Sequence, residues 1–422
     1  MARVLVGIAA ILLGTQTVRA DDSLTLDQAI QLALSRNERA QITDLQIVEA
    51  DAAVERAHVA FLPVLNASGN DAIRPRDKPV NTLQGSLQLS QPIINLPAFP
   101  LLAQAKHNLA AQRSQSIEDK RQLAFDVAKA YFAVLLAQEV VTAAQKKLDT
   151  ATADVADTEA QFKAQLVSSN DVTRARISLS SSVRELSQDR GQLDTAFIEL
   201  GYVINAPAPK QLARPTTQLE AGKNAPPAAE ALVAQSIAAR ADLTARKESA
   251  LAAHDFAREP RYRYFPTLGF IGQLTASDPA GTNGHTVDGS IQLAASWSIY
   301  DGGARSADAR TRDAAAEIAD LNAKALIRAI DADVRAAVTQ LTAAQQAAAA
   351  ARDASTAAAK SASETAILYH QGLAKAIELV DANEQRFAAD VSYAEAEYSV
   401  ANAYLALRQA MGLGPVEETA KK

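Results

Sequence analysis

Two long stretches of this chain contain almost no residue that interrupts a helix. No proline occurs in 101–206 or in 280–414, and the central part of each stretch holds a single glycine, Gly191 or Gly372. Proline and glycine are the strongest local interruptions of regular structure, so these stretches predict two regions of long helix. Alanine is abundant throughout and strengthens this prediction, because it loses no side-chain entropy in a helix.

The chain is also an internal two-fold repeat. A shift of 203 residues aligns Phe-Leu-Pro at 61–63 with Tyr-Phe-Pro at 264–266, and a shift of 207 aligns Asp171 with Glu378. Each half is predicted to contain a helix, two strands, a long helix, a turn and a helix, in the manner of a repeat protein. The predicted parts are a first repeat at 21–201, a linker at 202–229, a second repeat at 230–411 and a tail at 412–422.

Apolar residues recur at heptad spacing in both long helices, which indicates coiled-coil packing. In the first half these positions are Leu123, Val127, Ala130, Val134, Ala137, Val141, Ala144 and Leu148. In the second half they are Ile327, Ile330, Val334, Ala337, Leu341, Ala344, Ala348 and Ala351. A second stripe, which includes Ala128 and Tyr131, flanks the first seam and predicts neighbours on two sides. A closed ring of helices fits this pattern; an ordinary antiparallel bundle is the alternative that periodicity leaves open.

The lengths of the predicted helices indicate how they pack. The long helix at 101–165 would span roughly 100 Å. Its companions at 26–60 and 170–200 together have nearly the same length, and the first begins with a capping box of Thr25 and Gln28. In the second half, 304–371 matches the sum of 230–261 and 377–411. We therefore expect two half-length helices stacked end to end beside each full-length helix.

Residues 1–20 have the features of a secretory signal peptide. Arg3 supplies a positive charge, 4–14 an apolar stretch, and 18–20 a cleavage site of small residues. The apolar stretch is too short to cross a bilayer as a helix, and a buried N-terminal helix is the alternative. We predict cleavage after Ala20 and export of the protein.

Composition and motifs argue against several functions. The formal net charge of −6 does not favour nucleic-acid binding, and the absence of cysteine removes disulfides and thiolate sites. No nucleophile elbow, glycine-rich phosphate loop or HExxH helix is present. The five histidines, at 58, 107, 254, 285 and 370, lack metal-ligand spacing. No catalytic residue, cofactor or metal site is predicted, and the protein is expected not to be an enzyme.

Alternating segments at about 62–95 and about 265–301 predict two pairs of strands of membrane-spanning length. One face of each strand carries apolar residues, as expected beside lipid. The opposite face carries small, uncharged residues, as expected of a water-filled lumen. A half-buried soluble sheet is the alternative that alternation alone leaves open. Four strands cannot close a barrel in lipid, so the membrane interpretation requires several chains. The residues assigned to the lipid-facing side are Leu87, Leu89, Ile291, Leu293 and Trp297.

Several short segments recur in the order and spacing of one known family. They are the motifs at 61–63 and 264–266, Ile-Tyr-Asp-Gly-Gly at 299–303, and the helix-to-helix turns at 162–172 and 369–382. With them, the chain from 21 to 414 resembles the TolC family of outer-membrane efflux proteins.

The resemblance implies a mostly α fold with a transmembrane β part. Four strands from each of three protomers would form a 12-stranded β-barrel, continued by a periplasmic α-barrel of coiled-coil helices with an equatorial region at 202–229. It further implies an exit duct of a tripartite efflux or type I secretion system in the bacterial outer membrane. Its partners would be two further copies, outer-membrane lipid, a periplasmic adaptor and an inner-membrane pump, with no nucleic acid. A coiled-coil adaptor or structural protein without a pore is the alternative.

The resemblance also implies a gate where the two turns, about 163–169 and about 370–376, form the periplasmic tip. Family members link a first-turn Asp to a second-turn Tyr, which correspond here to Asp171 and Tyr369. The inward acids correspond to Glu378 and Asp381, which share a helix face. Carboxylate rings favour cations.

The turns themselves are the implied adaptor contacts, through Gln165, Leu166, Gly372 and Leu373. Gln165 stands where the family has glycine, a residue that commonly ends helices because it adopts positive φ without strain. The usual basic gate position holds Ala374, with Lys375 beside it.

Overall fold

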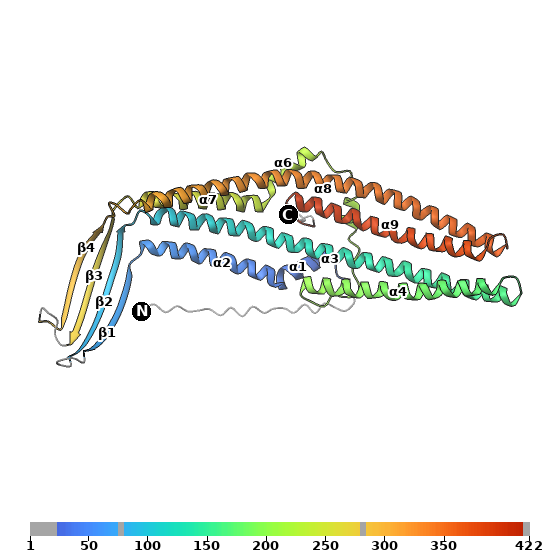
Figure 1. Cartoon of the computed structure of the whole chain (residues 1–422), viewed down its shortest axis with the longest axis horizontal. Helices are drawn as coiled ribbons and strands as arrows, with labels where there is room; N and C mark the ends of the chain where they lie inside the picture. Colours follow the sequence, from blue (N-terminus) through green and yellow to red (C-terminus); the bar gives the residue numbers. More distant parts are fainter. Residues whose placement is uncertain (1–22, 75–79, 279–283, 417–422) are drawn as a thin grey trace.

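The computed structural model describes residues 23–74, 80–278 and 284–416, and within them the chain is an elongated helical body with a sheet at one end (Figure 1). The predicted signal peptide lies outside the described residues. The helices are α1 (Leu26–Arg36), α2 (Glu38–His58), the 3-10 turn η1 (Val59–Phe61), α3 (Ala98–Lys163), α4 (Ser169–Ile204), α5 (Thr216–Ala221), α6 (Ala229–Ala239), α7 (Ala241–Tyr262), α8 (Ala304–His370) and α9 (Ala376–Ala410). The strands are β1 (Val64–Arg74), β2 (Val80–Ile94), β3 (Thr267–Asp278) and β4 (Val287–Ser296).

Four helical columns lie side by side along the body. α3 and α8 are full-length columns of 66 and 67 residues. α1, α2 and α4 pack on one side of α3, while α7 and α9 fill the space between α3 and α8 (Figure 1). This arrangement confirms the prediction that half-length helices stack end to end beside each full-length one.

In each repeat, the half-length column nearer the sheet is interrupted once, between α1 and α2 and between α6 and α7. These interruptions were not predicted from the sequence. A continuous helix was expected over 26–60 and over 230–261, but Asn37 and Arg240 have extended backbones. The Asn37 side chain accepts a hydrogen bond from the Arg39 backbone N–H and donates one to the Val203 carbonyl at 2.8 Å. The interruption at Asn37 costs little stability, because its side chain forms hydrogen bonds in place of those that a continuous helix would make.

Both interruptions lie beside the end of a helix that comes from the tip turns, α4 in the first repeat and α9 in the second. α4 ends at Asn205 and α9 near Gly412, and both residues have positive φ. The Asn205 side chain donates to the Arg36 carbonyl at 3.1 Å, while a Cβ at position 412 would lie 2.8 Å from the Cγ of Arg240. Glycine is therefore required at this second junction, and the two repeats close the junction with different residues.

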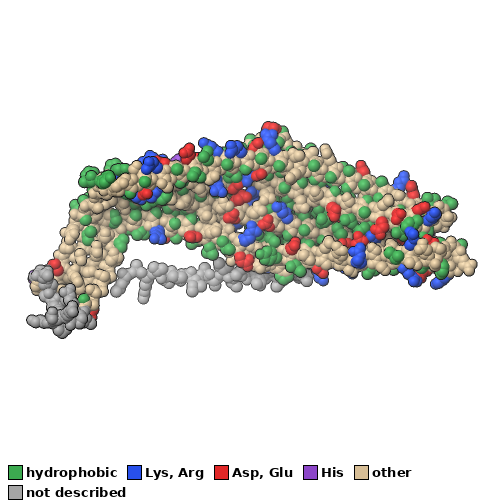
Figure 2. Space-filling model, viewed as in Figure 1, with side chains coloured by type: hydrophobic (Ala, Val, Ile, Leu, Met, Phe, Trp, Pro, Cys, Tyr) green, Lys and Arg blue, Asp and Glu red, His purple; other side chains and the backbone are tan. Residues whose placement is uncertain are grey.

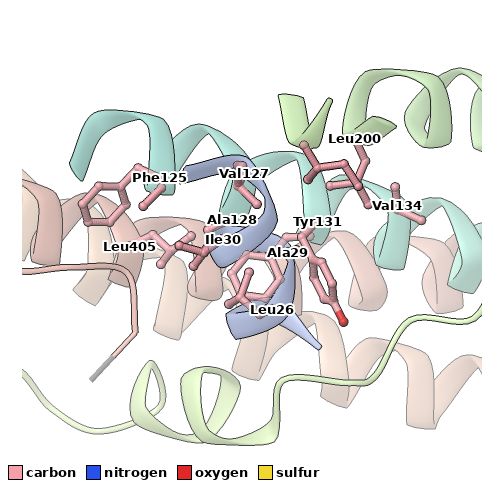
Figure 3. Packing of buried hydrophobic residues seen from close by; sticks show 14 of the residues in the cluster. Leu26, Ala29, Ile30, Phe125, Val127, Ala128, Tyr131, Val134, Leu200 and Leu405 are labelled. Atoms are coloured by element: carbon pink, nitrogen blue, oxygen red, sulfur yellow. The ribbon is translucent and has the colours of Figure 1, made fainter. Parts of the chain in front are cut away.

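The main hydrophobic core surrounds the middle of α3 (Figure 3). Val127, Ala128, Tyr131 and Val134 are fully buried there, which confirms both predicted stripes of this helix. The Tyr131 hydroxyl lies 2.6 Å from the Ala213 carbonyl oxygen, and burial raises its pKa to about 12, so the hydroxyl keeps its proton to donate. α3 is also long and apolar enough to cross a membrane, but its place among the other columns makes it the core helix.

The four strands form one antiparallel sheet in the order β1-β2-β3-β4. β1 and β4 are its open edges, and every residue of β4 is exposed. The sheet bends away from the helical body, and none of the described helices covers either face (Figure 1).

Candidate functional site

The register of the sheet gathers the alternating apolar residues on one face. Leu87 lies directly opposite Leu274, and Leu293 lies opposite Phe270. Opposed residues of neighbouring strands share a face, so the apolar positions of all four strands coincide. The row comprises Leu65, Leu87, Leu89, Phe270, Leu274, Ile291 and Leu293. Four of the five residues assigned to the lipid side from the sequence therefore lie on one continuous apolar face.

The fifth residue, Trp297, lies one position beyond the end of β4. Its indole N–H donates to the Tyr264 carbonyl at 3.0 Å, and its ring is exposed. Tyr264, Phe265 and Tyr300 are also exposed, and with Trp297 they lie in the segments that join β3 and β4 to the helices. Tryptophan and tyrosine are enriched at membrane–water interfaces, where an apolar ring and a polar edge are both accommodated.

The opposite face of the sheet is polar and uncharged over most of its length. Ser68 and Ser86 face each other across β1 and β2 with their hydroxyl oxygens 2.8 Å apart. Gln88 and Gln273 are likewise opposed. Charged side chains are common over the helical body and sparse over the sheet (Figure 2). One apolar and one small polar face are typical of strands between lipid and water.

A buried arginine fixes the sheet to α8. The Arg305 guanidinium donates to the Asp301 carboxylate at 2.8 Å and to the Arg263 and Ile299 carbonyls, and it lies over the Tyr264 ring. Hydrogen bonds from the Arg305 backbone N–H and side chain lower the pKa of Asp301. Arg305 was not predicted as a functional residue, because its only signal in the sequence is the spacing of four residues from Asp301.

The two turns at the far end of the body have the same backbone geometry. Gln165 has φ of +59° and Gly372 +74°. The Leu166 N–H donates to the Gln161 carbonyl at 2.9 Å, and the Leu373 N–H donates to the Leu368 carbonyl at 2.8 Å. Gln165 thus adopts the left-handed conformation that glycine adopts in the second turn. Leu166 and Leu373 are 75% and 72% exposed at the apices.

Asp171 and Glu378, which occupy equivalent positions in the two repeats, each cap the helix that follows a turn. The Asp171 carboxylate accepts from the Ser168 N–H at 3.0 Å and from its hydroxyl at 2.8 Å. Glu378 accepts from the Lys375 N–H at 3.3 Å. Each acid lies in the first turn of its helix, where a negative charge is stabilised by the helix dipole. Glu378 and Asp381 are both exposed.

Tyr369 is 5% exposed, and its hydroxyl lies 3.4 Å from the Thr158 hydroxyl of α3. Within one protomer the hydrogen bonds of the described residues do not join Tyr369 to Asp171, so the link between them stays a prediction for the assembled protein. Nor do the described residues place any three His, Cys, Asp or Glu side chains as a metal site.

A sheet of membrane-length strands with one uncovered apolar face, joined to long helical columns, defines a subunit of a membrane duct. The sequence profile of the family described as outer membrane efflux protein matches residues 29–206 and 232–413, one segment in each repeat. The chain belongs to this family of outer-membrane channel proteins. It is an exit duct of the outer membrane with a periplasmic helical extension.

Solved structures of such channels share the fold. CusC, solved in a study of folding and transmembrane channel formation, superposes with a TM-score of 0.81 at 17% identity, covering 92% of both chains. The open state of MtrE from Neisseria gonorrhoeae gives 0.78 at 19% identity, covering 92% of this chain and 89% of that one. VceC from Vibrio cholerae gives 0.74 at 16% identity, with 92% and 96% covered. Comparison with curated protein sequences gives no match.

Proposed function

We propose that three copies of this chain assemble into one channel, the exit duct of a tripartite efflux or type I secretion system. The observation that carries the proposal is the sheet, whose apolar face is uncovered and whose edge strands β1 and β4 lack partners within the described protomer. Open edges are not tolerated in lipid, so β4 of one copy must pair with β1 of the next. Three copies give a closed barrel of twelve strands.

The channel receives its substrate at the tip turns. An adaptor and an inner-membrane pump dock there, and the exposed Leu166 and Leu373 beside Gln165 and Gly372 are the contacts. The gate at the same end is formed by Asp171, Tyr369, Glu378 and Asp381 once three protomers meet. The protein performs no catalysis.

The test is oligomeric state together with conductance. Outer-membrane fractions should contain a heat-sensitive species of three times the protomer mass that resists detergent without boiling. The purified species should open pores in planar lipid bilayers. A protomer that stays monomeric, or an oligomer that leaves the bilayer insulating, would instead support an adaptor or a structural protein without a pore.

A further inference from the structure

The two helical hairpins of each protomer, α3 with α4 and α8 with α9, are joined by a charged cluster well above the tip turns. Lys147 of α3 lies between Glu185 of α4 and Glu384 of α9, with its Nζ 2.6 Å and 2.7 Å from their carboxylate oxygens. The Lys147 side chain is 9% exposed, and its Nζ lies 4.6 Å from the centre of the Phe387 ring. One cation thus bridges the first hairpin to the second.

Asp189 adds a carboxylate with one buried oxygen that accepts no hydrogen bond from the described part of the chain. It lies one turn after Glu185 on α4 and is 9% exposed. Its Oδ2 is buried and has no hydrogen-bond partner among the residues that the structure describes. Asp189 and Glu185 line the same hollow of about 390 Å³, together with Phe387 and Glu395 of α9. A buried carboxylate oxygen without a hydrogen bond destabilises the ionised acid more than the protonated acid.

The charges around this cluster come from three helices. α3 presents Lys146, Lys147, Asp149 and Asp154, α4 presents Glu185 and Asp189, and α9 presents Glu384, Arg386, Asp390 and Glu395. Acids outnumber bases, and Lys147 is already shared by two of them. Asp154 forms a second bridge between the hairpins by accepting a hydrogen bond from the Asn383 amide at 3.1 Å.

We propose that Lys147, Glu185, Glu384 and Asp189 form a proton-sensitive latch between the two hairpins of each protomer, which is tight when Asp189 is protonated and loosened when it is ionised. The latch rests on the proposed duct function. Each hairpin ends in one tip turn, so moving the two hairpins apart would also move the turns apart. None of its four residues belongs to the turns or to the acids of the gate.

The direction of the pH effect follows from the geometry. Burial raises the pKa of Asp189, and the negative charge of Glu185 raises it further, while Lys147 opposes both. Burial also raises the pKa of Asp154, partly offset by the hydrogen bond from Asn383. A carboxyl whose pKa is higher in the latched state binds its proton more tightly there. Latching is therefore favoured as the pH falls through the raised pKa, and the effect is lost at higher pH.

The experiment measures single-channel conductance of the full-length oligomer in planar bilayers from acidic to neutral pH. Wild-type resting conductance should be several-fold lower at the acidic end. Asp189→Asn, which imitates the protonated acid, should conduct weakly at both ends. Lys147→Met, which leaves the acids without their cation, should conduct more than wild type at both. The protein with the wild-type latch and all latch variants carry Glu378→Gln and Asp381→Asn, so that the gate acids contribute no pH dependence to any comparison.

Asp194→Asn is the matched control, because it removes the same charge from an exposed position of α4. Its pH response should equal that of wild type. If Asp189→Asn keeps the wild-type pH response, the latch is wrong even though the pore exists. If wild type forms no pore, the proposed function falls and the latch with it. A Lys147→Met chain that fails to assemble leaves the decision to Asp189→Asn.

Discussion

Gln165 is the one residue of the first turn that the backbone strains. Its φ of +59° is a conformation that costs a residue with a Cβ about 1–2 kcal/mol. Gln165→Gly removes this strain, offset in part by the larger entropy of glycine in the unfolded chain, so we expect a net gain of about 0.5–1 kcal/mol. Hydrogen exchange at the Leu166 amide, which closes the turn, should slow accordingly. Gly372→Gln should produce the opposite change at the Leu373 amide, which closes the second turn. Unchanged exchange at the corresponding amide in both variants would contradict the assigned strain.

At the scale of single residues, local hydrogen bonds could be predicted from the sequence better than contacts between distant segments. The capping box of Thr25 and Gln28 is present, with both hydrogen bonds formed, because such local patterns depend on neighbours in the chain. Lys147 escaped prediction because its partners come from other helices, and Arg305 because two of its acceptors are backbone carbonyls of connecting segments, at Arg263 and Ile299. A lysine or arginine within a helical seam has the same local pattern whether it is solvated or buried against an acid.

At the scale of the elements, substitutions on the two faces of β4 test whether the apolar face of the sheet contacts lipid. Leu293 belongs to the apolar row, while its neighbour Gln292 points to the polar face opposite Ile271. Leu293→Arg should destabilise the oligomer by about 2 kcal/mol, a cost that depends on depth in the bilayer. Gln292→Arg should leave assembly intact and change conductance. The measurement is the fraction of heat-sensitive oligomer in outer-membrane preparations; equal assembly of the two variants would place water on both faces.

Element type and order could be predicted because heptads, alternation and proline placement are repeated in both halves. The ends of the long helices were predicted to within a few residues. The interruptions at Asn37 and Arg240 could not be predicted in the same way, because neither residue is a strong helix breaker. They become intelligible only once α4 and α9 are seen to end beside them.

For the whole molecule, the order of the columns predicts which faces meet between protomers. α2 lies on one flank and α8 on the other, and each exposes apolar side chains, including Leu45 at 66% and Ile318 at 59%. Leu45 lies 13 residues before the end of α2 at His58, and Ile318 lies 14 residues after the start of α8 at Ala304. Both positions are therefore roughly 20 Å along the helices from the sheet.

The chain has no cysteine, so this interface can be tested by cross-linking. The pair Leu45→Cys with Ile318→Cys should yield a ladder up to a covalent trimer under mild oxidation. Leu45→Cys with Ile367→Cys is the control, because Ile367 is also exposed on α8 but lies near the tip. Cross-linking of the control pair alone would reverse the proposed alignment of protomers.

The gate is the property that only the assembled molecule can have. If Glu378 and Asp381 from three protomers face one another, six carboxylates surround a narrow opening. Their mutual repulsion is weakly screened at short range, so a trivalent cation should bind among them and block the pore. Glu378→Gln with Asp381→Asn removes all six charges and should raise the blocking concentration on the order of tenfold or more, equivalent to at least about 1.4 kcal/mol of binding free energy. The measurement is single-channel current titrated with the cation, and Asp353→Asn, which removes an exposed acid from α8, should leave the block unchanged. An unaltered block in the double variant would assign these two acids to the outer surface of the tip, where their remaining role is to cap and solvate the start of α9.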